Sequence, residues 1–254
     1  MPESNPMGRR AFLMTGAAAT ASAATLDAAR AQDPSNGNKS VLPTRVLGKT
    51  GAKVTILNQG TVGEPAALAR LLRHAYKEGV RYFDTAESYG NAETVFRDWF
   101  KAQPKVREEI FLATKHAVNE PGELLKQVDT RLERLGTDRI DLLFFHGLNT
   151  RQADWPKSAE VGRVVDAIKK SGKVRFVGFS THDATIARQL QNAATGGFID
   201  VIMLRFSPWL EKESDLNKAI DACHKAGIGL VSMKQIGGQA LRITVQRQLG
   251  QLER

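Results

Sequence analysis

The chain has 254 residues, 42% of them hydrophobic, and carries a formal net charge of +9. This length has room for one large domain or two small ones, and no apolar run reaches the ~20 residues that a membrane-spanning helix needs, so we expect no stable membrane span. A single cysteine excludes an intrachain disulfide. The basic residues are scattered and do not form an aromatic-rich cluster, so the sequence indicates no nucleic-acid partner.

The N-terminal residues 1–31 have the features of an export signal. Arg9 and Arg10 precede an uncharged segment, 11–26, and Ala29-Arg30-Ala31 supplies the small-x-small pattern of a signal-peptidase site. This pattern resembles a twin-arginine signal peptide, so we expect the twin-arginine export machinery as a partner and a periplasmic or otherwise exported protein. The alternative is a disordered or helical N-terminal arm. Residues 32–44 are too polar to pack and predict a flexible linker before a domain over residues 45–254.

Within that domain, short apolar runs alternate with amphipathic helical stretches. Residues 45–52 predict a hairpin that leads into the first barrel strand. The runs that predict strands are Val54–Leu57, Tyr82–Asp84, Ile110–Thr114, Ile140–Phe145, Val174–Phe179, Ile199–Leu204 and Gly229–Met233. Glycines follow the helical stretches, where left-handed caps are common: Gly79, Gly136, Gly172 and Gly227.

Strand–helix alternation of this kind predicts parallel strands with right-handed crossovers. No G-x-G-x-x-G pattern follows a predicted strand, which argues against a Rossmann nucleotide site. We therefore predict an α/β fold of the TIM-type (β/α)8 barrel class, incomplete with seven barrel strands and an N-terminal hairpin. A doubly wound sheet is the alternative.

Polar residues close three consecutive predicted strands. Asp84 and Tyr89 follow the second run, Lys115 the third and His146 the fourth. Barrel active sites collect at the carboxyl ends of the strands, so these side chains are candidates for one site. A Tyr hydroxyl is a weak acid with a reference pKa of about 10, which a neighbouring Lys⁺ lowers. An acid, a phenol, an ammonium and an imidazole are the groups needed to protonate a carbonyl oxygen.

From about residue 45 to 238, the chain resembles the aldo-keto reductases, which are (β/α)8 barrels that use NADPH without a Rossmann fold. The segments that carry the resemblance are FDTAESYG, with Glu93 shortly after it, FLATK, LERLGTDRIDLLFFHG, VRFVGFS and GIGLVSMK. The order and spacing of these segments make the resemblance specific.

The resemblance implies the catalytic tetrad Asp84, Tyr89, Lys115 and His146, with Tyr89 as general acid, Lys115 lowering its pKa, Asp84 pairing with Lys115 and His146 placing the carbonyl. It also implies cofactor-binding positions at Gly60, Thr61, Ser180, Thr181 and Lys234. The activity it implies is NADPH-dependent reduction of an aldehyde or ketone, or the reverse oxidation, with a small-molecule carbonyl compound as substrate.

The sequence departs from the family pattern at several nicotinamide-contacting positions. Thr181 stands where the family usually has Asn, Met203 where it usually has Gln, and Met233 where it often has an aromatic residue. Members of the family continue through an eighth strand and a basic loop that holds the adenosine 2′-phosphate. The expectation is therefore a C-terminally truncated gene, a frameshifted gene or a domain that closes differently.

Two alternatives remain open at this stage. The first is a non-catalytic barrel that keeps the four polar residues but binds the cofactor weakly. The second is a metal-assisted hydrolase that uses His116, His146 and His182, since three histidines at one rim can bind a metal. Side-chain alternation argues against it, because it places His116 on the opposite side of the strand from Lys115. The sequence thus predicts no metal site.

Overall fold

The computed structural model describes residues 42–206 and 214–234. Its strands are β1 (Thr44–Val46), β2 (Lys53–Thr55), β3 (Asn58–Gln59), β4 (Tyr82–Asp84), β5 (Phe111–His116), β6 (Ile140–Phe145), β7 (Val174–Thr181), β8 (Val201–Arg205) and β9 (Gly229–Met233). Its helices are α1 (Pro65–Lys77), α2 (Ala92–Ala102), α3 (Lys105–Glu109), α4 (Pro121–Leu135), α5 (Ala159–Lys170), α6 (Ile186–Gly196) and α7 (Ser214–Lys225). Three short 3₁₀ turns complete the described secondary structure: η1 (Gly48–Thr50), η2 (Thr150–Gln152) and η3 (Trp155–Lys157).

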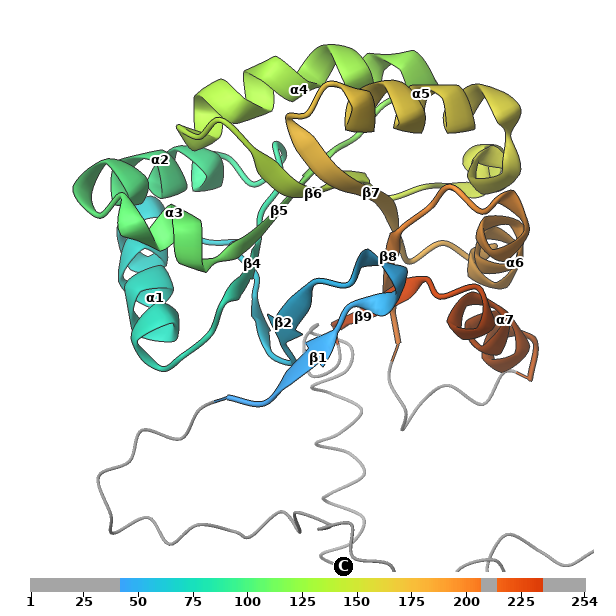
Figure 1. Cartoon of the computed structure of the whole chain (residues 1–254), viewed down its shortest axis with the longest axis horizontal. Helices are drawn as coiled ribbons and strands as arrows, with labels where there is room; N and C mark the ends of the chain where they lie inside the picture. The colour runs from blue at the N-terminus through green and yellow to red at the C-terminus, as the bar shows by residue number, and fades with distance from the viewer. Residues whose placement is uncertain (1–41, 207–213, 235–254) are drawn as a thin grey trace, which may run out of the picture. The chain divides into compact units, whose positions relative to one another are not determined.

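Seven parallel strands form one sheet in the order β3-β4-β5-β6-β7-β8-β9. The sheet curls on itself, and the helices lie outside it (Figure 1). Each strand pairs with the next one in the chain, as right-handed crossover connections require. The predicted incomplete TIM-type barrel of seven strands is confirmed, as is the N-terminal hairpin.

The first predicted barrel strand was wrong in its placement. Most of the run Val54–Leu57 belongs to the hairpin or its exit, because β2 pairs antiparallel with β1, and the barrel begins at β3. Val54 is buried, whereas Ile56 and Leu57 are each 56% exposed. An apolar run of four residues does not distinguish a hairpin arm from a buried parallel strand, which explains the error.

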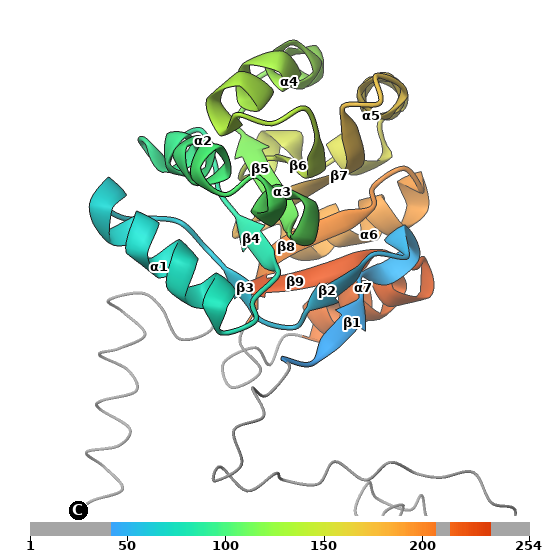
Figure 2. The same cartoon turned by 60° about the vertical axis from the view of Figure 1, so that its left-hand side comes forward.

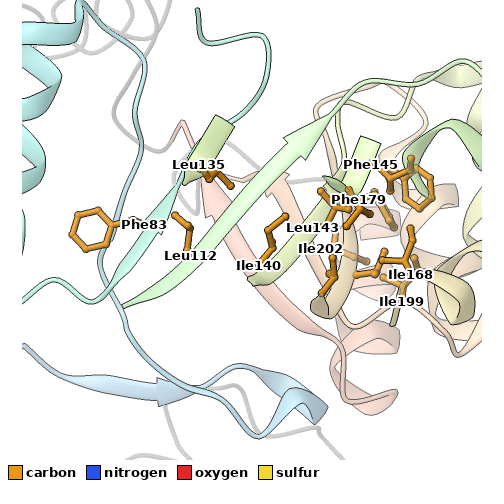
Figure 3. Packing of buried hydrophobic residues seen from close by; sticks show 14 of the residues in the cluster. Phe83, Leu112, Leu135, Ile140, Leu143, Phe145, Ile168, Phe179, Ile199 and Ile202 are labelled. Carbon is orange, nitrogen blue, oxygen red and sulfur yellow. The ribbon is translucent and has the colours of Figure 1, made fainter. Parts of the chain in front are cut away.

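Two apolar layers follow from the alternation of side chains along the strands. On β6, Leu142 and Phe144 face the barrel interior, whereas Leu143 and Phe145 face the helices. Part of the outer layer is shown in Figure 3. The hairpin lies beside β9 (Figure 2) and contributes Leu47 to the interior layer. The interior is therefore a packed core, as expected for a barrel of this size.

The predicted helix cap after α4 is confirmed. Gly136 has a φ of +63°, in the left-handed region that side chains rarely adopt. A Cβ atom there would stand 2.4 Å from Cγ of Arg97, so the close approach of α2 also requires glycine. This cap turns the chain from α4 into β6, the strand that carries His146 at its end.

Candidate active site

The structure brings the four predicted polar residues to the carboxyl ends of neighbouring strands. Asp84 ends β4, Lys115 lies near the end of β5, and His146 directly follows β6. Tyr89 lies in the loop between β4 and α2. Residues two positions before Lys115 and His146, Ala113 and Phe144, face the barrel interior, so the alternation of side chains directs both toward the barrel mouth.

A buried ion pair forms the base of this cluster. The Lys115 ammonium contacts Oδ1 of Asp84, and their side chains are 1% and 9% exposed. Lys115 Nζ also donates to the carbonyl of Thr85 at 2.9 Å. The other carboxylate oxygen of Asp84 accepts from Asn58 Nδ2 at 3.0 Å. A buried ammonium is tolerated only when it is paired and hydrogen-bonded, as this one is.

Tyr89 and His146 stand over this ion pair. Lys115 Nζ lies 5.1 Å from the centre of the Tyr89 ring. The rings of Tyr89 and His146 are 5.8 Å apart and nearly perpendicular, at 82°. Both side chains are half-buried, whereas the ion pair beneath them is buried. The arrangement places a phenol and an imidazole between the solvent and a fixed positive charge.

Burial lowers the pKa of His146 below its usual 6.5, and the neighbouring Lys115 cation lowers it further. Glu87 acts in the opposite direction but does not outweigh them. Both effects disfavour the imidazolium, the first through lost hydration and the second through like-charge repulsion. His146 is therefore neutral at neutral pH.

Gly60, Thr61 and Lys234, three of the predicted cofactor positions, follow the two edge strands of the sheet. A Cβ atom at Gly60 would lie 3.7 Å from Oδ2 of Asp84, so this glycine lies beside the ion pair. Thr61 is buried, and its hydroxyl has no hydrogen-bond partner among residues 42–206 and 214–234. Lys234 follows β9 and is exposed.

Ser180 and Thr181, the other two predicted cofactor positions, end β7 and make different contacts. The Ser180 hydroxyl accepts from the N–H of Gly147 at 2.9 Å and so holds the turn after His146. The Thr181 hydroxyl donates to the carbonyl of Leu148 at 3.3 Å, and the side chain is fully buried. Both hydroxyls therefore bind the backbone of the turn that follows His146.

The methionines that replace polar or aromatic residues of the family pattern lie in the interior layer. Met203 is buried and Met233 is half-buried, and both pack with apolar neighbours such as Phe144. A thioether is at most a weak hydrogen-bond acceptor. These two positions therefore provide apolar packing and no strong hydrogen-bonding group.

The remaining rim histidines differ in their surroundings. His116 is half-buried, burial lowers its pKa from 6.5, and its buried Nδ1 has no partner in the described part of the chain. His182 is exposed. Over the described ranges, no group of three or more His, Cys, Asp or Glu side chains is placed to hold a metal ion.

Sequence reasoning missed two polar contacts of the cluster. Asn58 holds Asp84, and Glu87 lies 3.6 Å from Nδ1 of His146. Burial acts to raise the pKa of Glu87, but the N–H groups of Ala117 and Ser88 outweigh it and hold that pKa below its usual value. The position of Glu87 inside the FDTAESYG segment could have indicated that it lies near the site. The contact of Asn58 with Asp84 could not have been predicted in this way, because it depends on the register of β3.

An ion network outside the barrel anchors the start of the helix that follows Tyr89. Glu93 is fully buried and accepts from Arg131 at 2.9 Å, from Arg134 at 3.1 Å and from the Thr114 hydroxyl at 2.8 Å. Burial raises the pKa of Glu93 despite these partners. Arg134 also donates to the carbonyl of Gly90, the residue after Tyr89. The network thus fixes the loop that carries the phenol.

A parallel α/β barrel with a buried Lys–Asp pair beneath a tyrosine and a histidine defines a small class of proteins. The sequence model of the "Aldo/keto reductase family" matches residues 54–252. The chain belongs to this family.

Individual relatives agree with this assignment. The chain is 30% identical over 223 residues to "Aldo-keto reductase yakc [NADP(+)]" of Schizosaccharomyces pombe, across 77% of this chain and 62% of that one. It is 28% identical over 205 residues to L-galactose dehydrogenase of Arabidopsis thaliana, across 74% of this chain and 63% of that one. The chain therefore spans less than two thirds of the length of these curated relatives.

A solved structure shows the same fold. A thermostable aldo-keto reductase crystallised with the inhibitor epalrestat superposes with a TM-score of 0.64 at 22% identity, over 84% of this chain and 81% of that one. Within the described ranges, no helix is both long and apolar enough to cross a membrane.

Proposed function

We propose that this protein reduces an aldehyde or ketone to an alcohol with NADPH, or catalyses the reverse oxidation, at the carboxyl end of the barrel. The observation that carries the proposal is the buried Asp84–Lys115 ion pair beneath the Tyr89 ring. Membership of the aldo/keto reductase family supports it, and so does the name of the fission yeast relative, which specifies NADP(+).

In this mechanism Tyr89 is the general acid. Its hydroxyl gives a proton to the carbonyl oxygen while the carbonyl carbon receives a hydride, so that one proton and one hydride convert the carbonyl to an alcohol. The Lys115 cation stabilises the phenolate that remains, because an opposite charge nearby favours the ionised form. Asp84 keeps Lys115 charged and in place. In the oxidation direction, the phenolate of Tyr89 takes the proton back.

His146 places the carbonyl oxygen beside Tyr89 when its imidazole donates a hydrogen bond to that oxygen. Its ring packs edge-to-face against the Tyr89 ring, with the centroids 5.8 Å apart, so a carbonyl oxygen bound on the solvent side of this pair can approach both. The hydrogen bond from Gly147 to Ser180 fixes the turn that carries this ring. A positioned hydrogen-bonding group of this kind contributes through orientation rather than through net binding.

The residues at the rim fit a nicotinamide cofactor in part. Among residues 42–206 and 214–234, the buried hydroxyl of Thr61 has no hydrogen-bond partner, Lys234 is exposed, and Gly60 leaves space beside Asp84. Thr181 fits less well, because its hydroxyl is already bonded to Leu148. When bound, the cofactor supplies the hydride.

The experiment that tests the proposal is consumption of NADPH with a panel of aldehydes and ketones. Tyr89→Phe should lower kcat by about 10²–10⁴-fold, the usual contribution of a general acid. Tyr76→Phe is the matched control, since the Tyr76 hydroxyl lies outside the barrel against Glu109. A Tyr89→Phe variant with unchanged turnover would refute the role of Tyr89, and no turnover with any carbonyl compound would refute the activity.

A second candidate is a barrel that keeps the polar cluster but binds NADPH weakly. It is favoured by Met203, which is buried among apolar residues where the family usually has a glutamine. A lost hydrogen bond between neutral groups removes about 0.5–1.5 kcal/mol. Fluorescence titration of the purified chain with NADPH tests this candidate, and a sub-micromolar dissociation constant would rule it out.

We also infer export through the twin-arginine route. The support is the order of Arg9 and Arg10, the uncharged segment 11–26 and the Ala29-Arg30-Ala31 site in the sequence. These residues lie outside the described part of the chain. Replacing Arg9 and Arg10 with lysine should abolish periplasmic accumulation, whereas Arg30→Lys, which keeps the arginine pair, should not. Undiminished periplasmic protein in the double variant would contradict the inference.

A further inference from the structure

The carboxylate of Glu87 lies between the loops that carry the candidate catalytic residues. Its Oε1 accepts from the N–H of Ala117, just after β5, at 3.3 Å, and its Oε2 accepts from the N–H of Ser88. The same Oε2 lies 3.6 Å from Nδ1 of His146, and the two side chains are 20% and 21% exposed. Glu87 is thus fixed by backbone groups and faces one particular nitrogen of the imidazole.

We propose that Glu87 is the positioning residue of His146: its carboxylate holds the imidazole with the proton on Nδ1, and it thereby leaves Nε2 without a proton while the ring is neutral. An ionised carboxylate accepts hydrogen bonds and cannot donate them, so it favours N–H on the nitrogen that faces it. At 3.6 Å this contact is longer than a hydrogen bond, so the carboxylate acts on the neutral ring mainly through the field of its negative charge.

The second group near Nδ1 does not decide the tautomer. The Ser88 hydroxyl lies 3.4 Å from Nδ1 of His146, and a hydroxyl can donate or accept as required. Only Glu87 imposes a direction. Because the N–H of Ser88 binds Glu87, this segment presents both groups to the same edge of the ring.

The other charges around His146 come from several elements. Lys115 on β5 and His182 after β7 disfavour the imidazolium, whereas Glu87 favours it; His116 at the end of β5 faces Glu87. Burial and Lys115 keep the ring neutral at neutral pH, as described above. The tautomer therefore determines what His146 offers a ligand over most of the physiological range.

The consequence for the reaction rests on the proposed function. A neutral ring with the proton on Nδ1 accepts a hydrogen bond at Nε2, which suits the hydroxyl of an alcohol substrate. It donates from Nε2 to a carbonyl oxygen only after a second proton binds. The contribution of His146 to carbonyl reduction is therefore present below its pKa and lost as pH rises through it, whereas its contribution to alcohol oxidation has the opposite dependence.

The test is ¹⁵N NMR of the imidazole nitrogens in the full chain, at a pH where His146 is neutral, with His146→Gln used to assign the signals. The wild type should show the tautomer with the proton on Nδ1. Glu87→Gln should shift the ring toward the tautomer with the proton on Nε2, because an amide NH₂ can donate to Nδ1. Ser88→Ala is the matched control and should retain the wild-type tautomer.

A wild-type ring with its proton on Nε2 would overturn the proposal, as would an unchanged tautomer in folded Glu87→Gln. When the same NMR signals are followed as a function of pH, Glu87→Gln should also lower the pKa of His146, because a negative charge that favours the imidazolium is removed. An unchanged pKa would likewise count against Glu87. Neither measurement requires catalytic turnover, so failure of this proposal can be distinguished from failure of the proposed reductase activity.

Discussion

This barrel contains two ion clusters that are similarly buried but differ in their roles. Arg107 on α3 pairs with Asp141 at the start of β6 at 3.0 Å, with side chains 7% and 5% exposed. Arg107 also donates to the Thr137 hydroxyl and the carbonyl of Ile110, while Asp141 accepts from the N–H of Leu112. Asp141 also accepts from Arg175 at 2.8 Å, and that arginine side chain is 53% exposed. This cluster, at the amino ends of the strands, links α3, β6 and β7.

The Asp84–Lys115 pair lies at the other end of the strands. It is equally buried, but it borders the half-buried rings of Tyr89 and His146. Burial of a charge therefore does not identify a site in this molecule. The two clusters differ in their neighbours. The Arg107–Asp141 cluster is surrounded by protein groups that hydrogen-bond to it, whereas the Asp84–Lys115 pair lies beside side chains that can still bind a ligand.

The largest effect should come from removing the charge in the carboxyl-end cluster. Lys115→Met should lower kcat by about 10²–10⁴-fold, because the phenol of Tyr89 loses the cation that supports its ionisation. Stability should also fall by about 3–5 kcal/mol, since Asp84 is left buried and unpaired. Urea unfolding and steady-state kinetics on the same preparation measure both effects.

The matched control is Lys169→Met, which breaks the pair of Lys169 with the buried Asp200 outside the barrel interior. It should lose stability and keep the wild-type kcat. Equal losses of turnover in the two lysine variants would show that Lys115 acts only through stability.

A smaller effect, confined to stability, is expected at the amino-end cluster. Asp141→Asn keeps the shape of the side chain and removes the charge that neutralises Arg107. We expect a loss of about 3–5 kcal/mol in the free energy of unfolding and an unchanged kcat/KM for the folded protein. A fall in kcat/KM comparable to that of Asp84→Asn would erase the distinction between the clusters.

The smallest effect concerns pH. The pKa of His146 lies below 6.5 in the folded protein, so the unfolded chain binds the proton more readily as pH falls through about 6.5. The free energy of unfolding should therefore decrease from about pH 7 to about pH 5.5. His146→Gln should flatten this slope in part, because His116 contributes in the same direction. The wild-type slope in His146→Gln would contradict the assignment.

Much of the architecture could be predicted from the sequence because its signals are local. Apolar runs, cap glycines such as Gly136 and polar strand ends predicted the seven-stranded barrel and a shared site for Asp84 and Lys115, whose pairing the family resemblance implied. The exception was the first strand, where a two-residue β3 carries too little pattern to be distinguished from the hairpin arm before it.

The finer parts of the site depend on geometry that the sequence does not display. The side chain of Asn58 reaches Asp84 only because β3 pairs in register with β4, and Glu87 meets His146 across two loops. Contacts between residues at the ends of different strands could therefore not be predicted from the sequence.

The central claim is that this chain transfers a hydride to a carbonyl carbon with Tyr89 as the proton donor. The most direct measurement uses NADPH carrying deuterium at the transferable position, a panel of aldehydes and ketones, and mass spectrometry of the alcohol product. We predict one deuterium on the carbinol carbon with the wild-type chain and with Tyr76→Phe, and almost none over the same time with Tyr89→Phe. Alcohol without deuterium, or equal labelling by Tyr89→Phe, would contradict the account.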